Sequence, residues 1–140
     1  MTAPTTLSAL DETTAVARFV RFLETNDAPE GLFAPDCFSD VTLPLWRLQA
    51  ADADALVAIR RNGHPVTGQV RVTRVEPTPR GFTMEVEERW EDGGQQWYCR
   101  EMFRADVTGA TITELAVYCT GDWDERQQRA HSAEVVLLRP

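Results

Sequence analysis

The stretch that decides the fold runs from Phe82 to Phe103 and reads FTMEVEERWEDGGQQWYCREMF. Its two halves alternate apolar and polar residues, which is typical of β-strands with one buried face. Gly93 and Gly94 lie between the halves, and such a pair supplies the positive φ angles of a tight type I′ turn. The stretch therefore predicts a long β-hairpin in which Asp92 lies opposite Gln95.

This register sorts the side chains onto two faces, because directly opposed residues project to the same side of a sheet. One face carries the pairs Trp90 with Trp97, Glu88 with Cys99, Val86 with Glu101, and Met84 with Phe103. The other carries Arg89 with Tyr98, Glu87 with Arg100, Glu85 with Met102, and Thr83 with Arg104. The first face is predicted to be buried, and the second carries paired opposite charges.

Glu88 and Glu101 are the exceptions on the apolar face, where they are diagonal neighbours within reach of one another. Burial and a like-charged neighbour both raise carboxyl pKa values, and such a pair can titrate as one unit. Acid–base catalysis uses this arrangement. We interpret Glu88 and Glu101 as candidate catalytic residues in a pocket wall. The alternative is that one or both lie near an open sheet end, or pair with an arginine from elsewhere in the chain.

Length and composition predict one domain, with a flexible N-terminus over 1–10 and a single folded unit over 11–140 that includes a C-terminal arm. The N-terminal residues lack the basic region and apolar core of a signal peptide. No run approaches the ~20 apolar residues of a membrane span. We therefore expect a cytoplasmic protein with no membrane partner.

The formal net charge is −8, and all 14 basic residues are arginine. The absence of lysine excludes lysine Schiff-base chemistry, and the dispersed arginines of an acidic chain argue against a nucleic-acid partner. Cys37, Cys99 and Cys119 show no C-x-x-C spacing and are predicted to be buried free thiols. The two histidines are far apart in sequence, so we expect no metal site, and the sequence indicates no cofactor.

The first half of the chain is predicted to form a helix over 11–24, a short helical turn over 29–33 and a strand near 37–44. In that strand Phe38, Asp40 and Thr42 share one side, and Cys37, Ser39, Val41 and Leu43 share the other. Pro44 indicates that the strand ends at a sheet edge. A second helix follows, capped by Asp52 or Asp54 and closed at Asn62-Gly63.

The second half is predicted to be mostly strand, over 69–76, the hairpin, and 111–119, with a turn over 77–81. Asp122 and Glu125 have the spacing of a capping box, which predicts a short helix to about Ala130. The tail AEVVLLR is expected to be a last strand or an arm packed on the body. Helices that come first and long antiparallel strands that follow indicate an α+β fold with helices on one sheet face.

Four segments carry a resemblance to a known family: AVARFVRFLETND, LFAPDCFSDVTLP, DADALVAIRRN and ITELAVYCTGDWDE. Over residues 12–126 their order resembles the nuclear transport factor 2-like fold, in its SnoaL-like, ketosteroid-isomerase-like branch. The resemblance implies a cone-shaped, strongly curved, mostly antiparallel sheet around the N-terminal helices, with a pocket between helices and sheet. It also implies a small apolar or polycyclic ligand, and a homodimer through the convex face, which the hairpin's charged side chains would suit.

Enzymes of this branch include isomerases, polyketide cyclases, dehydratases and epoxide hydrolases, and they commonly use a pocket carboxylate for proton transfer. The isomerases carry a base aspartate on the first strand, and the nearest candidate here is Asp40, one residue out of alignment. Val117 stands where the epoxide hydrolases have a catalytic aspartate, and Arg89 with Glu91 only loosely matches their arginine–aspartate pair. These departures leave Glu88 and Glu101 as the preferred catalytic residues.

His64 lies in a loop near the expected pocket mouth, where it could shuttle protons; the alternative is a solvent-exposed loop histidine. Asp122 and Asp124 could also be catalytic, although helix capping already accounts for Asp122. The four tryptophans, with Trp123 the last, could line an aromatic pocket or could simply pack in the core or at its rim. The predicted substrate-binding residues are Trp46, Met84, Trp90, Trp97, Cys99, Phe103 and Val117.

Together these observations predict a cofactor-independent enzyme of cyclase, isomerase or dehydratase type in specialised metabolism. Glu88 or Glu101 would take a proton next to a carbonyl of an apolar substrate, and a neutral group would stabilise the enolate. One alternative is a binding module that uses the same cavity without chemistry. Another is a structural homodimer whose pocket is filled by its own side chains.

Overall fold

A computed structural model describes residues 14–140. The chain forms α1 (Ala15–Thr25), β1 (Phe33–Leu43), β2 (Trp46–Ala50), α2 (Ala53–Gly63), β3 (Gln69–Thr78), β4 (Gly81–Asp92), β5 (Gln95–Thr108), β6 (Thr111–Cys119) and α3 (Glu125–Glu134). The predicted flexible segment 1–10 and the start of the first predicted helix lie outside the described residues. None of the helices within the described range is long and apolar enough to cross a membrane.

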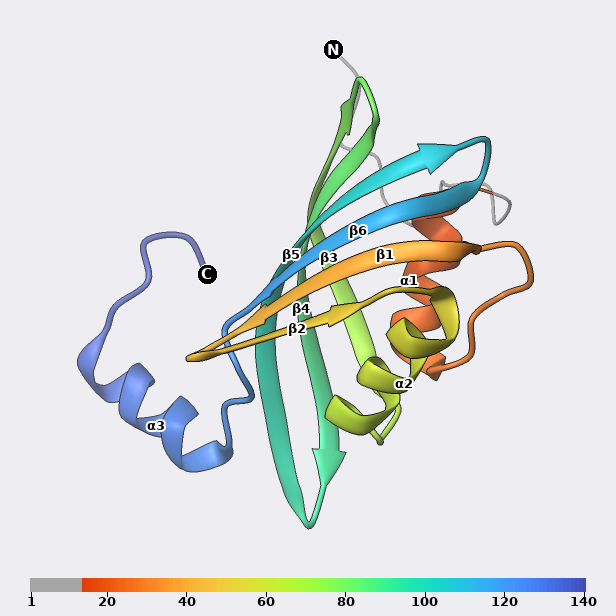
Figure 1. The fold of residues 1–140 in the computed structure, drawn as a ribbon. Helices are drawn as coiled ribbons and strands as arrows, with labels where there is room; N and C mark the ends of the chain where they lie inside the picture. The colour runs from red at the N-terminus through yellow and green to blue at the C-terminus, as the bar shows by residue number, and fades with distance from the viewer. Residues whose placement is uncertain (1–13) are drawn as a thin grey trace.

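The six strands form one curved, unclosed sheet in the order β2-β1-β6-β5-β4-β3. β1 and β6 pair in parallel, and every other neighbouring pair is antiparallel. Figure 1 shows α1 and α2 side by side on one side of this sheet, with α3 lying apart from them across the sheet in this view. The arrangement is an α+β cone, so the predicted fold class is confirmed.

The hairpin forms in the predicted register, with Asp92 opposite Gln95 and Gly93 and Gly94 both at positive φ. The apolar face of β4 and β5 packs against α1, whose apolar positions recur at helical spacing. Phe19 of α1 lies edge-on to Phe103 of β5, with ring centroids 4.9 Å apart. β4 and β5 are the longest strands, with 12 and 14 residues, and Figure 1 shows their hairpin extending beyond the other strands at the lower end of the sheet.

One expectation for the first half of the chain is wrong, and one strand was not predicted. The predicted helical turn over 29–33 is a single turn closed by a hydrogen bond from the Leu32 amide to the Pro29 carbonyl; Gly31, at a φ of 79°, prevents its continuation as a helix. The short strand β2 was not predicted, because its turn carries Leu45 at a φ of 59° where glycine is usual. Asp52, and not Asp54, caps α2 through the Ala55 amide.

The second half differs at element ends. β3 continues through Pro77, which is tolerated because β3 is an edge strand. The last helix is capped by Asp124, not by Asp122, and extends to Glu134. The tail is not a strand: after α3 the chain runs to its end without regular structure, and the side chains of Val136 and Leu138 are 89% and 95% exposed.

Candidate functional site

The site is built on Glu88 and Glu101, which β4 and β5 present from the concave face of the sheet. Both are buried, with 4% and 7% of their surface exposed. The pairing register of β4 and β5 places both side chains on this face, because Glu88 lies opposite the buried Cys99 and Glu101 lies opposite the buried Val86. The sequence therefore correctly identified two buried carboxyl groups on an otherwise apolar wall.

Arg60 holds Glu88 in place. Its guanidinium donates two hydrogen bonds to the Glu88 carboxylate, at 2.6 and 2.8 Å, and a third to the Leu23 carbonyl at 2.6 Å. The same guanidinium lies 4.0 Å from a carboxyl oxygen of Glu101. For Glu88, the structure therefore confirms the alternative interpretation, in which the glutamate pairs with an arginine from elsewhere in the chain.

The sequence analysis did not single out Arg60, although a signal was present. Arg60 lies four residues after Leu56, so both occupy one face of α2, and these are the two buried residues of that helix. An arginine on the buried face of a helix needs an acidic partner. Only the packing of α2 against the sheet shows that this partner is Glu88.

The two carboxyl groups have opposite pKa shifts. For Glu88, burial raises the pKa, but hydrogen bonds from Glu101 and Arg60 outweigh it and lower the pKa to about 2. For Glu101, burial, the charge of Glu88 and their shared hydrogen bond raise the pKa well above its usual range. Within the pair, Glu101 is therefore the group that holds the proton more tightly, and it donates to the Glu88 carboxylate. The charges of Arg60 and Glu88 then cancel.

Glu101 and Arg60 form the polar part of a small cavity between the helices and the sheet. The cavity has a volume of about 50 Å³, and apolar side chains from α1, α2, β1, β5 and β6 complete its lining. Among the predicted substrate-binding residues, Phe103 and Val117 line it. Sites for drug-sized ligands have volumes of about 300–1,000 Å³, so this cavity takes a few waters or one functional group and not a whole polycyclic molecule.

Other predicted site residues lie close by but outside this lining. Met84 and Cys99 are buried in the same sheet face, at 1% and 0% exposure. Trp90 and Trp97 stack with ring centroids 6.4 Å apart, and His64 lies edge-on to Trp90 at 4.9 Å. The aromatic pair thus forms a separate wall beside the loop that follows α2.

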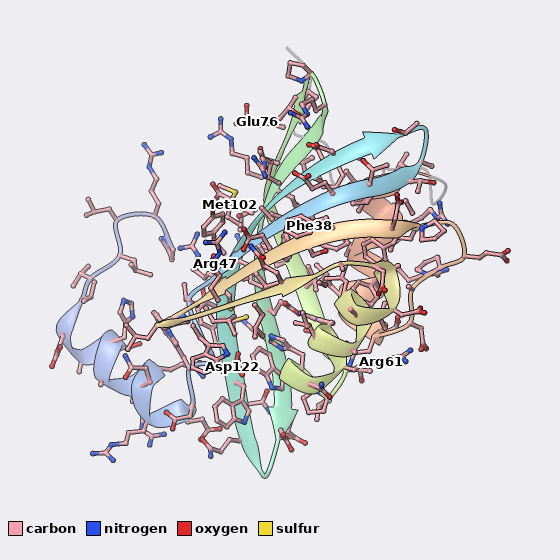
Figure 2. All side chains as sticks on the ribbon, in the orientation of Figure 1. Phe38, Arg47, Arg61, Glu76, Met102 and Asp122 are labelled. Atoms are coloured by element: carbon pink, nitrogen blue, oxygen red, sulfur yellow. The ribbon has the colours of Figure 1, made fainter. Side chains whose placement is uncertain are left out.

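Two predicted site residues are placed away from the cavity. Asp40 projects from the opposite side of β1 to Val41, and its carboxylate accepts hydrogen bonds from Arg47. Trp46 is 67% exposed at the start of β2. In Figure 2 the labelled side chains of Phe38, Arg47, Glu76 and Met102 all project from the outer face of the sheet. Strand alternation explains the position of Asp40, because neighbouring residues of a strand point to opposite faces.

His64 is not a solvent-exposed loop residue. Its side chain is 13% exposed, and its Nε2 lies 3.9 Å from a carboxyl oxygen of Asp122, which is labelled in Figure 2. Burial raises the pKa of Asp122. His64, Glu88 and Cys99 bring one potential metal-ligand atom each within 4.8 Å of one another. However, both carboxylate oxygens of Glu88 already accept hydrogen bonds from Arg60.

Cys119 completes this polar cluster, a role that the sequence analysis missed. Hydrogen bonds with the Cys99 thiol, with His64 and with the Gly121 amide lower its pKa to about 5, although burial opposes this. The Gly121 nitrogen lies 3.3 Å from the Cys119 sulfur. The strand order would have revealed the cluster, since Cys119 lies opposite Glu101 on β5. All three cysteines are free thiols, as predicted, and Cys119 is only partly buried.

No protein-family model and no curated protein sequence matches this chain. Solved structures do match. A ketosteroid isomerase-like protein from Catenulispora acidiphila, in complex with trimethylamine, has a TM-score of 0.61 at 13% identity, covering 76% of this chain and 85% of its own. An epoxide hydrolase of the LEH-like type from M. tuberculosis has a TM-score of 0.59 at 15% identity, covering 75% and 79%.

A third match is IdmH from Streptomyces antibioticus, named as a candidate polyketide cyclase. It has a TM-score of 0.59 at 13% identity, and the match covers 75% of this chain and 88% of IdmH. At such identities the likeness establishes the fold alone. The chain therefore has the nuclear transport factor 2-like, ketosteroid isomerase-like fold that the order of its segments predicted.

Proposed function

We propose that this protein is a cofactor-independent small-molecule enzyme that carries out general acid–base catalysis at Glu101 and Glu88. The observation that carries the proposal is the buried carboxyl group of Glu101 in the wall of an apolar cavity, next to the Glu88–Arg60 ion pair, where burial and the charge of Glu88 raise its pKa. A neutral acid in such surroundings can donate a hydrogen bond to a carbonyl oxygen as negative charge develops there.

The roles follow from the two pKa shifts. Glu101 lines the cavity, so it is the group that contacts the substrate. One of its carboxyl oxygens would give its proton to the carbonyl oxygen, and the other would take the proton next to the carbonyl, so that the enol forms. Glu88 accepts from Arg60 and from Glu101, so it positions Glu101 and compensates for the charge of Arg60. This refines the sequence-based hypothesis, in which either glutamate served as the base.

The size of the cavity limits the substrate. A volume of about 50 Å³ admits one functional group, so a carbonyl end would enter while the rest of the molecule lies outside or displaces side chains. An apolar, carbonyl-bearing compound with a proton next to the carbonyl fits the lining. The corresponding reactions are isomerisation, dehydration and cyclisation, and the match to a candidate polyketide cyclase supports the same class.

The first experiment measures proton exchange. The full-length protein is incubated in deuterated water with small β,γ-unsaturated ketones and 1,3-diketones, and deuterium uptake next to the carbonyl is followed by NMR. We expect catalysed exchange, and we expect Glu101→Gln to lower the rate at least ~100-fold, the lower end of the range for general acid–base catalysis. Glu87→Gln, on the outer face of β4, serves as the matched control and should keep the full rate.

Full activity in the Glu101→Gln variant would contradict the proposal. A second candidate, a non-catalytic binding module, is favoured by one observation: the bidentate ion pair with Arg60 gives Glu88 a structural role. In that case the ketones would bind without exchange, and Glu101→Gln would change their dissociation constant only. Measuring binding of the same ketones by protein NMR separates the two functions.

A further inference from the structure

A second group of reactive side chains lies next to the carboxyl pair, at the junction of β6 with the segment that leads to α3. It consists of Cys99, Cys119, His64 and Asp122. Cys119 is the last residue of β6 and lies opposite Glu101, so it shares the concave face with Cys99 two residues along β5. The acid–base proposal uses none of these four residues.

The backbone at this junction holds the two thiols together. The Thr120 amide donates to the Arg100 carbonyl, and the amides and carbonyls of Tyr98 and Trp123 bond reciprocally. Three residues of β5, Tyr98 to Arg100, therefore lie opposite four residues of the other segment, Thr120 to Trp123. Cys99 is at the centre of this irregular pairing, where the Gly121 amide points to the sulfur of Cys119.

The two thiols have different environments. Cys99 is fully buried, at 0% exposure, whereas Cys119 is partly accessible. Imidazole and amide N–H groups stabilise a thiolate, so Cys119 is the thiol that is activated for nucleophilic attack. The pKa values agree with this assignment: that of Cys119 is lowered to about 5, and that of Cys99 is raised, first by its hydrogen bond with Cys119 and then by burial.

We propose that Cys119 and Cys99 are a redox-active dithiol that a hydroperoxide converts into a disulfide, with Cys119 as the attacking thiol and Cys99 as the resolving thiol. An accessible thiolate next to a second thiol is the arrangement found in thiol redox sensors. The proposal stands independently of the acid–base function. His64, which hydrogen-bonds to Cys119, and Asp122, which lies next to His64, would serve as positioning residues.

The chemistry balances in two steps. The Cys119 thiolate attacks the outer oxygen of the peroxide, so that an S–O bond forms, the O–O bond breaks and water or an alcohol leaves. Cys99 then attacks the resulting sulfenic sulfur, so that the S–S bond forms and the S–O bond breaks. The oxygen leaves as water and takes the proton of the Cys99 thiol. Two sulfurs lose one electron each, and the peroxide gains two.

The test uses the full-length reduced protein and hydrogen peroxide, read by intact mass and peptide mapping. We expect a mass loss of about 2 Da and a cross-linked peptide pair that contains Cys99 and Cys119. Cys37→Ser is the matched control, because Cys37 is buried on β1 away from the cluster, and it should oxidise in the same way. In the Cys99→Ser variant, oxidation should stop at a sulfenic acid on Cys119, which dimedone traps as an adduct.

Further variants test each role. Cys119→Ser should leave Cys99 reduced under the same peroxide dose, and circular dichroism checks that each variant folds. His64→Gln should shift the pH profile of Cys119 alkylation by iodoacetamide to higher pH, an effect that a purely structural role would not produce. The proposal is overturned if wild-type protein gains oxygen on Cys119 without cross-linking, if the disulfide forms only between chains, or if Cys99 reacts first.

Discussion

The guanidinium of Arg60 lies between the carboxyl groups of two glutamates, and it binds that of Glu88 through both oxygens at 2.6 and 2.8 Å. This ion pair joins the last turn of α2 to the centre of β4 in a buried environment. It fixes the helix over the concave face and places the charged Glu88 next to Glu101, which raises the pKa of Glu101. The geometry of the cavity wall therefore depends on Arg60.

Replacement of Arg60 by methionine should lower the free energy of unfolding at neutral pH by about 3–5 kcal/mol, since it leaves the Glu88 carboxylate buried without its partner. The loss should become smaller at low pH, where Glu88 can take up a proton. Denaturant unfolding measures both effects. Arg61→Met is the control, because Arg61 pairs with Asp27 on the surface and should cost at most about 1 kcal/mol.

The two glutamates should give the stability a characteristic pH dependence. The pKa of Glu101 is raised in the folded state, so the folded protein holds this proton more tightly than the unfolded chain does. The stability that this provides is fully present below pH 4.5 and is lost as pH rises through the raised pKa. In that range the slope approaches about 1.4 kcal/mol per pH unit. The pKa of Glu88 is lowered to about 2, so its carboxylate contributes its full stabilisation above pH 4.5. This stabilisation is lost as pH falls from 4.5 to 2.

Glu101→Gln should therefore remove the loss of stability above pH 4.5. The measurement is the free energy of unfolding of both proteins from pH 3 to pH 8 in denaturant. Carbon-detected NMR of the glutamate carboxyl signals checks the same point directly. Parallel curves for wild type and variant above pH 4.5 would mean that Glu101 titrates normally.

Gly81 and Gly63 differ in the space available for a side chain, so alanine substitutions at these two positions can be compared directly. A Cβ at Gly81 would lie 2.0 Å from the Ala105 carbonyl oxygen, so Gly81→Ala should disrupt the pairing of β4 with β5 and lower the melting temperature by several degrees. A Cβ at Gly63, at the end of α2, meets nothing within 4 Å. Gly63→Ala should be neutral or stabilising by about 0.4–1 kcal/mol. Differential scanning calorimetry distinguishes these outcomes, and equal effects would contradict the close approach at Gly81.

The structure shows which of two aspartates caps α2, a choice that the sequence left open. The Asp52 carboxylate accepts from the Ala55 amide at 2.8 Å. Asp52→Ala should therefore cost about 1 kcal/mol. Asp54→Ala, in the first turn, removes only a favourable interaction with the helix dipole and should cost about 0.3–1 kcal/mol. Denaturant unfolding of the two variants tests the order, which would be reversed if Asp54 were the cap.

The resemblance predicts a homodimer through the convex face of the sheet. On that face Phe38, Met102 and Tyr118 are 39%, 41% and 59% exposed. Sedimentation velocity should show a dimer, and Met102→Glu should shift it toward the monomer, because the new carboxylate would be buried against apolar surface. A monomeric wild type at all concentrations would remove this expectation.

The elements that depend on local pattern could be predicted from the sequence. The alternation of residues 82–103 with its Gly-Gly turn predicted the register and the shared apolar face of Glu88 and Glu101, because register follows from the turn and the period of two. It did not predict the length of β5, which continues to Thr108. The helical spacing of Phe19 and Leu23 likewise predicted a helix that the structure confirms. The order of these elements was enough to predict the fold.

The chemistry of the site depends on contacts between segments that are distant in sequence, and these contacts could not be predicted. Arg60, His64 and Cys119 come from α2, its following loop and β6, and no local pattern records that these segments meet at Glu88 and Glu101. The pKa of each glutamate depends on distances across those segments, which is why the two carboxyl groups of one buried pair have opposite shifts. Asp40 was assigned by its alignment with the base aspartate of the isomerases, and strand alternation puts it on the outer face instead. Trp46 was expected as a pocket aromatic, and its position at the start of an edge strand leaves it 67% exposed.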